Sequence, residues 1–155
     1  MDRPYVVGID IGGQSAKIGI VDTRGTVLSQ TAIKSNDTNS HVEFIENLCS
    51  AVEKLAEKAN IPMSKIRGIG IGAPNANYYT GTIENAVNLT FGGMKVIPFA
   101  DLMSERIGLP VRLTNDANAA AVGEMTYGAA RGMKNFITIT LGTGVGSGIV
   151  VGGYV

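Results

Sequence analysis

The chain has 155 residues, which is enough for one domain of average size with a core of its own. Its 13 basic and 13 acidic residues give a formal net charge of zero and form no block of like charge, so neither nucleic acid nor an anionic membrane is expected as the main partner. No apolar run is long enough to cross a membrane, and no signal-peptide pattern opens the chain. We therefore expect a cytoplasmic protein.

The first third of the chain predicts three strands and a helix. Strands over 5–11, 16–21 and 26–33 are joined by short turns and form an antiparallel meander. Ser40 and Glu43 then make a capping box that opens a helix. Its apolar residues keep helical spacing: Ile45, Leu48, Cys49, Val52, Leu55, Ala56 and Ala59. Cys49, the single cysteine, is therefore interpreted as a small buried hydrophobe, and no disulfide can form within the chain.

The rest of the chain alternates strands with helices. Residues 66–71 form an apolar run punctuated by glycines, which follows a helix as in a crossover unit and is expected to join the sheet in parallel. The stretch 72–96 shows no helical period, and loops of that length are usually functional or disordered. The elements expected after it are a helix over 98–107, a strand over 111–114, a helix from 116 to about 131, and strands over 136–141 and 148–151.

Two glycine loops, at 10–15 and 141–148, each interrupt a strand-like run, and we interpret the pair as a clamp for a phosphate chain. Glycine permits close backbone approach and inward-pointing N–H groups because it lacks Cβ and tolerates positive φ. Neither loop leads into a helix, which excludes a Walker-type loop and a dinucleotide-binding loop. An ordinary hairpin turn is the alternative for the first loop. The second has four alternating glycines, which weaken a strand without benefit to stability.

The block Asn115-Asp116-Ala117-Asn118 sets one carboxylate among amides where a strand gives way to an alanine-rich helix. Together with the two glycine loops, it indicates phosphoryl transfer to a hydroxyl. The alternative is a helix cap, since Asp and Asn at a helix start commonly accept backbone N–H groups. One cap needs one such residue, however, and three polar side chains crowd this position.

The order strand-strand-strand-helix-strand-helix-strand-helix resembles one lobe of the actin-like ATPase fold, a ribonuclease H-like α/β architecture with a mixed sheet and flanking helices. Five motifs resemble, in the same order, those of the ROK family: 10–13 with Lys17, 70–74, 88–89, 115–124 and 141–146. The resemblance spans practically the whole chain, and the Asn-Asp-Ala-Asn block with the second glycine loop is its most specific part. The family includes bacterial glucokinases, which the chain resembles most, other sugar kinases and sugar-responsive repressors.

The resemblance implies ATP-dependent phosphorylation of a hexose hydroxyl. Asp10 would hold Mg²⁺, directly or through water. The residues expected at the ATP phosphates are Asp10, Gly12, Gly13, Gln14, Lys17, Thr143, Gly144 and Gly146. A turn-capping role is the alternative for Asp10, and a merely solvated side chain is the alternative for Lys17.

The resemblance also implies the roles of the sugar-binding residues. Asp116 would be the general base that takes the proton from the sugar hydroxyl, and Asn115 and Asn88 would bind sugar hydroxyls, because amides both donate and accept hydrogen bonds. Asn75 stands after Pro74 where the family usually has glycine, so a backbone contact to the sugar becomes a side-chain contact. Turn residues are the alternative for Asn88 and Asn115.

The same resemblance divides the chain into an N-terminal lobe over 1–133 and the opening hairpin of a truncated second lobe over 134–155. The family's zinc cluster and a further sugar clamp would follow the second glycine loop, so we expect no zinc site in this chain and no kinase activity from these 155 residues alone. The uncovered hairpin predicts a homodimer or higher homo-oligomer. Its apolar positions are Phe136, Ile137, Ile139, Leu141, Ile149 and Val151.

Two other functions are possible on the same scaffold. A sugar-responsive repressor of this family would carry a helix-turn-helix domain before the first glycine loop, and only nine residues precede Asp10, which favours the enzyme. A nucleotide-binding fragment with no sugar function is the second alternative. Sugar-dependent ATP turnover by the complete protein would exclude it.

Overall fold

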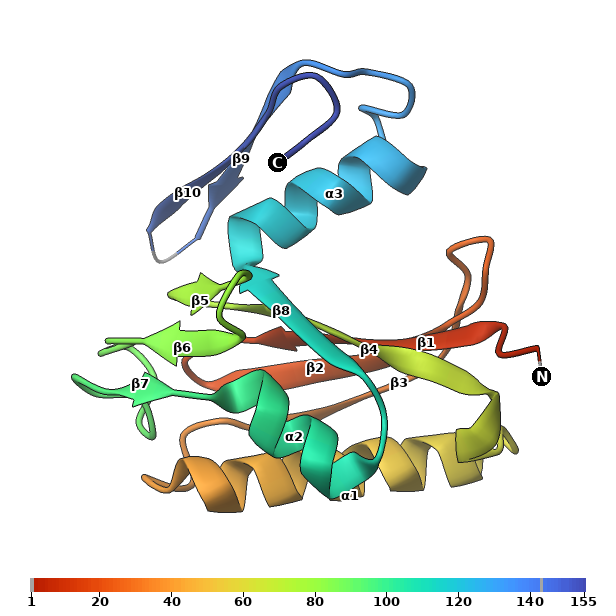
Figure 1. The fold of residues 1–155 in the computed structure, drawn as a ribbon, viewed down its shortest axis with the longest axis vertical. Helices are drawn as coiled ribbons and strands as arrows, with labels where there is room; N and C mark the ends of the chain where they lie inside the picture. Colours follow the sequence, from red (N-terminus) through yellow and green to blue (C-terminus); the bar gives the residue numbers. More distant parts are fainter. Residues whose placement is uncertain (1, 143) are drawn as a thin grey trace.

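The structure, a computed structural model, describes residues 2–142 and 144–155. A five-stranded sheet in the order β3-β2-β1-β4-β8 forms its centre (Figure 1). The first three strands pair antiparallel, whereas β4 and β8 run parallel to β1, so the predicted meander and the predicted parallel strand are both confirmed. The strands are β1 (Tyr5–Ile11), β2 (Ser15–Val21), β3 (Val27–Lys34), β4 (Ile66–Ala73) and β8 (Val111–Asn115).

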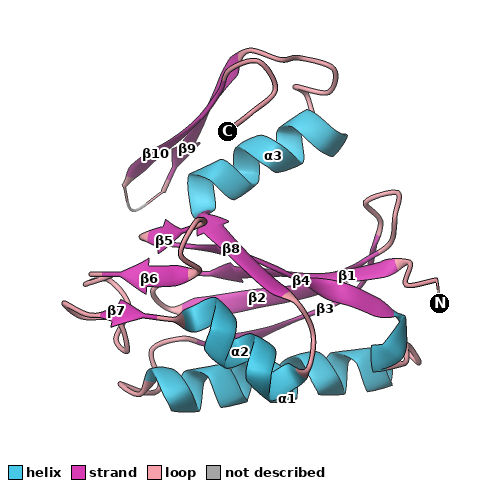
Figure 2. Cartoon of the chain, in the orientation of Figure 1, coloured by secondary structure: helices cyan, strands magenta, loops and turns pink. Residues whose placement is uncertain are grey.

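Two helices, α1 (His41–Lys58) and α2 (Phe99–Ile107), cover one face of this sheet (Figure 2). Strand residues alternate accordingly, since Ile9 is buried under the helices while its neighbour Asp10 is exposed on the other face. At the start of α1 the hydroxyl of Ser40 accepts the N–H of Glu43 at 3.3 Å, as the capping box predicts. The Glu43 carboxylate accepts the hydroxyl of Thr38 instead of the N–H of Ser40, so only one of the two hydrogen bonds of a capping box forms. A short 3₁₀ turn, η1 (Met63–Lys65), leads from α1 into β4.

The core between the sheet and these helices is aromatic at one end. Phe44, Phe91 and Phe99 are almost completely buried, and the Phe44 and Phe91 rings stack with centroids 4.5 Å apart. Cys49 is fully buried in α1, and burial raises the pKa of its thiol to about 11. The thiol stays protonated at neutral pH, so the prediction of a small buried hydrophobe is confirmed.

The stretch 72–96, expected as a loop, contains short strands. β5 (Ala76–Asn77), β6 (Thr82–Glu84) and β7 (Val96–Ile97) form a small antiparallel sheet. Asn75 and Asn85 adopt positive φ angles of 54° and 53°, which asparagine tolerates better than most residues. Strands of two or three residues are too short for an alternating pattern to reveal.

The third helix, α3 (Asp116–Tyr127), lies across the other face of the central sheet and ends about four residues earlier than predicted (Figure 1). Its end is set by Glu124, whose carboxylate accepts the N–H of Ala129 at 2.8 Å. The N–H of Gly128, with φ of −105° and ψ of −153°, donates to the Glu124 carbonyl. Glu124 therefore caps its own helix from within.

No described helix is long and apolar enough to cross a membrane.

A separate hairpin of β9 (Phe136–Leu141) and β10 (Val145–Val150) packs on the outer side of α3 (Figure 1). The expectation that β10 begins at 148 is wrong, because Gly146 and Gly148 lie within the strand and pack against α3. A Cβ at Gly148 would lie 2.5 Å from the carbonyl oxygen of Ala117 and 2.6 Å from Cβ of Ala121. These glycines contribute close packing, contrary to the expectation that they bring the strand no benefit.

The outward face of the hairpin is apolar, whereas Phe136 turns toward α3 and is half-buried. The exposed apolar side chains are Ile137, Ile139, Leu141, Val145, Ile149 and Val151, each at least 55% exposed, and Ser147 is the polar side chain exposed among them. A contiguous apolar face of this kind is typical of an interaction surface.

We expect the 155-residue chain to self-associate through this face at micromolar concentration, measured by light scattering. Substituting Ile137→Lys together with Ile139→Lys should yield a monomer, because burying two ammonium groups opposes docking. Val87→Lys alters a side chain that is 73% exposed elsewhere and should leave the association unchanged. A monomeric unsubstituted chain would contradict the expectation.

Candidate functional site

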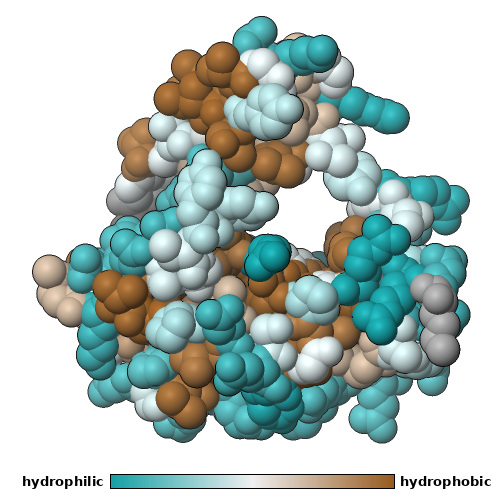
Figure 3. Space-filling view, viewed as in Figure 1, coloured by the Kyte–Doolittle hydropathy of each residue, from teal (hydrophilic) through white to brown (hydrophobic). Residues whose placement is uncertain are grey.

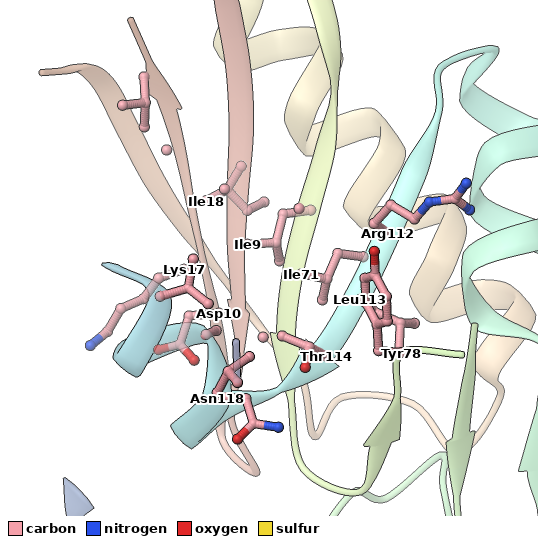
Figure 4. Close-up of a pocket in the computed structure, with 18 of the residues that line it drawn as sticks. Ile9, Asp10, Lys17, Ile18, Ile71, Tyr78, Arg112, Leu113, Thr114 and Asn118 are labelled. Carbon is pink, nitrogen blue, oxygen red and sulfur yellow. The ribbon is translucent and has the colours of Figure 1, made fainter. Parts of the chain in front are cut away.

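A cavity of about 1390 Å³ lies between the open face of the central sheet and α3 (Figure 3). Every strand of the central sheet contributes to its floor, and Asn118, Ala119, Val122 and Met125 of α3 contribute to its roof. The lining is mostly apolar; Asp10, Thr114 and Asn118 lie together at one end, which we call the polar end (Figure 4), and further polar side chains, among them Gln30 and Arg112, lie elsewhere in the lining. This combination is typical of small-molecule sites.

A row of glycines crosses the floor of this cavity. The strand register pairs Gly8 with Gly19 on one side and with Gly70 on the other. Gln30 and Arg112 continue the row on the outer strands. A Cβ at Gly8 or Gly70 would meet nothing within 4 Å, so the sheet is open along this row.

The next register row carries the expected acid. Asp10 of β1 pairs with Lys17 of β2 and with Gly72 of β4, and Gly72 pairs with Thr114 of β8. Figure 4 shows Asp10, Thr114 and Asn118 at the same end of the cavity. A Cβ at Gly72 would lie 3.6 Å from Cα of Asp116. Asp10 and Asp116 therefore flank one glycine, although they are more than a hundred residues apart in sequence.

At the start of α3, two polar side chains act as helix caps. Asn115 is the N-cap, and its side-chain oxygen accepts the N–H of Ala117 at 3.0 Å. Oδ1 of Asp116 accepts the same N–H at 2.8 Å. Because two side chains share one donor, either can engage a ligand while the other keeps the cap. Asp116 is exposed, and the half-buried Asn118 faces the cavity.

The first glycine loop is the tight turn between β1 and β2. The N–H of Gly12 donates to the carbonyl of Ser15 at 2.9 Å. A Cβ at Gly13 would lie 2.9 Å from the carbonyl oxygen of Asn88, so glycine is needed there for close approach of the two segments. Gln14 and Asn88 are exposed. The structure thus brings a predicted phosphate loop against a predicted sugar residue.

The second glycine loop joins β9 to β10, and its expected residues differ in surroundings. The N–H of Gly142 donates to the carbonyl of Gly144, and Gly144 is exposed, with no atom within 4 Å of its Cβ position. A Cβ at Gly146 would lie 2.5 Å from the Thr140 hydroxyl and 3.2 Å from Cβ of Ala117. Thr143 lies outside the described residues. Gly144 is thus open to a ligand, whereas Gly146 anchors the hairpin to the first turn of α3.

Asn75 is occupied in holding the small sheet together. Its amide nitrogen donates to the carbonyls of Glu84 and Asn85, at 3.0 and 3.1 Å. Hydrogen bonds from Thr82, Asn77 and Thr80, in that order of effect, hold the pKa of Glu84 below its usual value. A smaller cavity of about 490 Å³ is lined by Asn75, Glu84 and Asn118 among others. Asn118 lines both cavities, so the smaller cavity, with Asn75, lies beside the main one.

Comparison with known proteins establishes the family. The sequence pattern that defines the ROK family matches residues 6–155. The chain belongs to the ROK family. A glucokinase from Halalkalibacterium halodurans is 40% identical over 153 residues, which cover 98% of this chain and 45% of the relative. A xylose repressor from Caldicellulosiruptor bescii is 29% identical, over 97% of this chain and 37% of the relative.

Among solved structures, a ROK family glucokinase from Streptomyces griseus in complex with glucose and AMPPNP has a TM-score of 0.81 and 35% identity, over 96% of this chain and 45% of that one. This likeness confirms the predicted lobe of the actin-like ATPase fold. The chain spans about half the length of these relatives. Its ROK relatives include both sugar kinases and repressors, so family membership alone does not choose between the two.

The described residues of this ROK chain contain no group of three or more His, Cys, Asp and Glu side chains able to hold a metal ion. Mg²⁺ does not require one, because it is commonly bound through one or two carboxylates together with substrate phosphates. The exposed carboxylate of Asp10, at the polar end of the cavity, fits that requirement.

Asn118 and Thr114 line the cavity but were not predicted as site residues. A signal for Asn118 was present, since it belongs to the crowded polar block at the start of α3 and is not needed as the cap. Thr114 carries no such signal, because only the register of β8 beside β4 places it next to Gly72.

Close packing of the hairpin on α3 can be tested with one methyl group. Gly148→Ala should lower the free energy of unfolding by about 1–3 kcal/mol, because the new Cβ overlaps the backbone of α3. Gly142→Ala is the control, since its Cβ would meet nothing within 4 Å. Urea denaturation of both variants measures the difference, and equal stabilities would contradict the packing role.

Proposed function

We propose that the natural chain containing these residues catalyses ATP-dependent phosphorylation of a hexose hydroxyl, with Asp116 as the general base. The observation that supports this most is that Asp10 and Asp116 both lie beside Gly72, Asp10 as its register partner in the cavity lining and Asp116 with its Cα 3.6 Å from the Gly72 Cβ position, although Asp116 itself does not line the cavity. Similarity to glucokinases over nearly the whole chain supports the same reaction class.

The proposed base has the features that proton abstraction requires. Asp116 is exposed, and the N–H of Ala117 donates to its Oδ1. We assign Oδ2 to the substrate hydroxyl, whose proton it takes as the hydroxyl attacks the γ-phosphoryl group. Asn115 and Asn88 would orient the sugar by donating to and accepting from its other hydroxyls. Asn75 would contribute its side-chain oxygen, because its amide nitrogen holds the small sheet.

The phosphate chain would lie between the two glycine loops. On one side we assign Gly12, Gly13, Gln14 and Lys17, and on the other Thr143, Gly144 and Gly146. Asp10 would hold Mg²⁺, which neutralises phosphate charge when bound. Positioning and charge stabilisation would supply most of the acceleration in such a transfer.

A sugar-responsive repressor scaffold is the second candidate, supported by the similarity to the xylose repressor. One experiment on the natural chain distinguishes the two functions. The protein is tested with a panel of hexoses for sugar-dependent ADP release and, in parallel, for sugar binding by calorimetry. Turnover supports the kinase. Binding without turnover supports the repressor scaffold and contradicts the kinase.

Asp116→Asn in the natural chain should lower kcat by about two orders of magnitude or more, the usual range for losing a general base, while sugar affinity changes much less. Steady-state kinetics with ATP and the preferred sugar measure both. Asp101→Asn is the matched control, because Asp101 is likewise an exposed aspartate in the first turn of a helix. A near-normal kcat for Asp116→Asn would leave Asp116 as a helix cap only.

Gly144→Val should raise the KM for ATP more than the KM for sugar, because a branched side chain would stand where phosphate oxygens approach the backbone. The Cβ position of Gly144 is open, so the substitution itself should not disturb folding. Melting temperature is measured alongside the kinetics. Equal increases in both KM values would argue against a phosphate role for this loop.

A further inference from the structure

One buried polar side chain has no part in the proposed chemistry. Ser35 follows β3 directly and is 1% exposed, and among the described residues it is the one buried side chain that is polar. Burying a hydroxyl is unfavourable unless it is hydrogen-bonded, so a serine at such a position indicates a specific partner.

All three polar groups of Ser35 are engaged by loops of the proposed site. Its N–H donates to the carbonyl of Gln14 at 3.1 Å, and its hydroxyl donates to the carbonyl of Gly12 at 2.5 Å. Its own carbonyl accepts the hydroxyl of Thr90 at 3.1 Å. Ser35 therefore connects the first glycine loop to the segment that follows Asn88.

The segment around Thr90 is firmly anchored. Leu89 and Phe91, on either side of Thr90, are each 1% exposed, and Phe91 stacks on Phe44 in the core. The single hydroxyl proton of Thr90 is shared between the Ser35 carbonyl and the carbonyl of Thr38, which lies 3.0 Å from the Thr90 oxygen. The exposed Asn88 is thus attached to a rigid support, and the glycine loop is attached to the same support through Ser35.

We propose that Ser35 is a positioning residue which, together with Thr90, sets the place of the first glycine loop relative to Asn88. The contact between Gly13 and the Asn88 carbonyl brings the two segments together, and Ser35 fixes their spacing. This rests on the proposed function, in which the loop binds phosphate and Asn88 binds sugar. A misplacement of about 1 Å between reacting groups costs on the order of a hundredfold in rate, so losing one hydrogen bond that positions the loop should lower the turnover rate.

The test compares Ser35→Ala and Thr90→Val with Thr90→Ser in the natural chain. The first two remove a hydroxyl from the link, and each should lower kcat about tenfold to a hundredfold. Thr90→Ser keeps the hydroxyl and should retain near-normal kcat. Ser104→Ala is the matched control, because its hydroxyl also donates to a backbone carbonyl, that of Leu109 at 2.8 Å, at the end of α2.

The melting temperatures of Ser35→Ala and Ser104→Ala should fall by similar amounts, while only Ser35→Ala loses turnover. Equal kcat in the two variants would overturn the proposal, because the role of Ser35 would then be structural only. So would a Thr90→Ser variant as slow as Thr90→Val.

A second readout does not depend on turnover. In ¹H–¹⁵N spectra, Ser35→Ala and Thr90→Val should both shift or broaden the amide signals of Gly12 and Gln14, whose carbonyls accept hydrogen bonds from Ser35; Gly13 is not used, because it also lies against the Asn88 carbonyl. A natural chain with no turnover on any sugar, but with these amide changes, would contradict the proposed function and support the link. Unchanged amides in the glycine loop would overturn the link, whatever the activity.

Discussion

The close approach of α3 to two sheets is the constraint on which the site depends. Gly72 of the central sheet meets Ala119 and the backbone of Asp116, and Gly148 of the hairpin meets Ala117 and Ala121. Small residues therefore face small residues on two sides of one helix. Any larger side chain at these glycines would push the helix away, because packed interiors leave little room for an extra methyl group.

This packing determines what the start of α3 can do. The helix begins directly after β8, so Asp116 is placed at the carboxyl end of the parallel strands, where ligands bind in open α/β sheets. Because the hairpin also packs on the first turn of α3, the second glycine loop is attached to the same point. A single short helix thus fixes the position of the proposed base relative to both the central sheet and the second glycine loop.

The first glycine loop is positioned differently, by hydrogen bonds. Ser35 and Thr90 connect it to a segment anchored by aromatic packing, whereas the second loop is held by the contact of glycine with alanine. The two sides of the proposed phosphate site therefore rest on separate supports. ROK relatives include kinases and repressors, and a scaffold with separately supported loops is compatible with either use, so the function must be argued from the side chains at the site.

The sequence by itself determined the elements whose signals are local. The first three strands with their short turns, the Ser40 cap of α1, the burial of Cys49 and the polar block at the start of α3 all depend on neighbours within a few residues, and all were predicted. The tertiary structure decided which glycines remain open and which are used for packing, since Gly144 and Gly146 look alike in sequence but only Gly146 lies against Thr140 of β9 and Ala117 of α3. It also decided the pairing of the three short strands after β4 and the placement of Asp10 beside Gly72. Close backbone approach and strand register bring together segments that are far apart in the chain, and local sequence patterns do not indicate which segments these are.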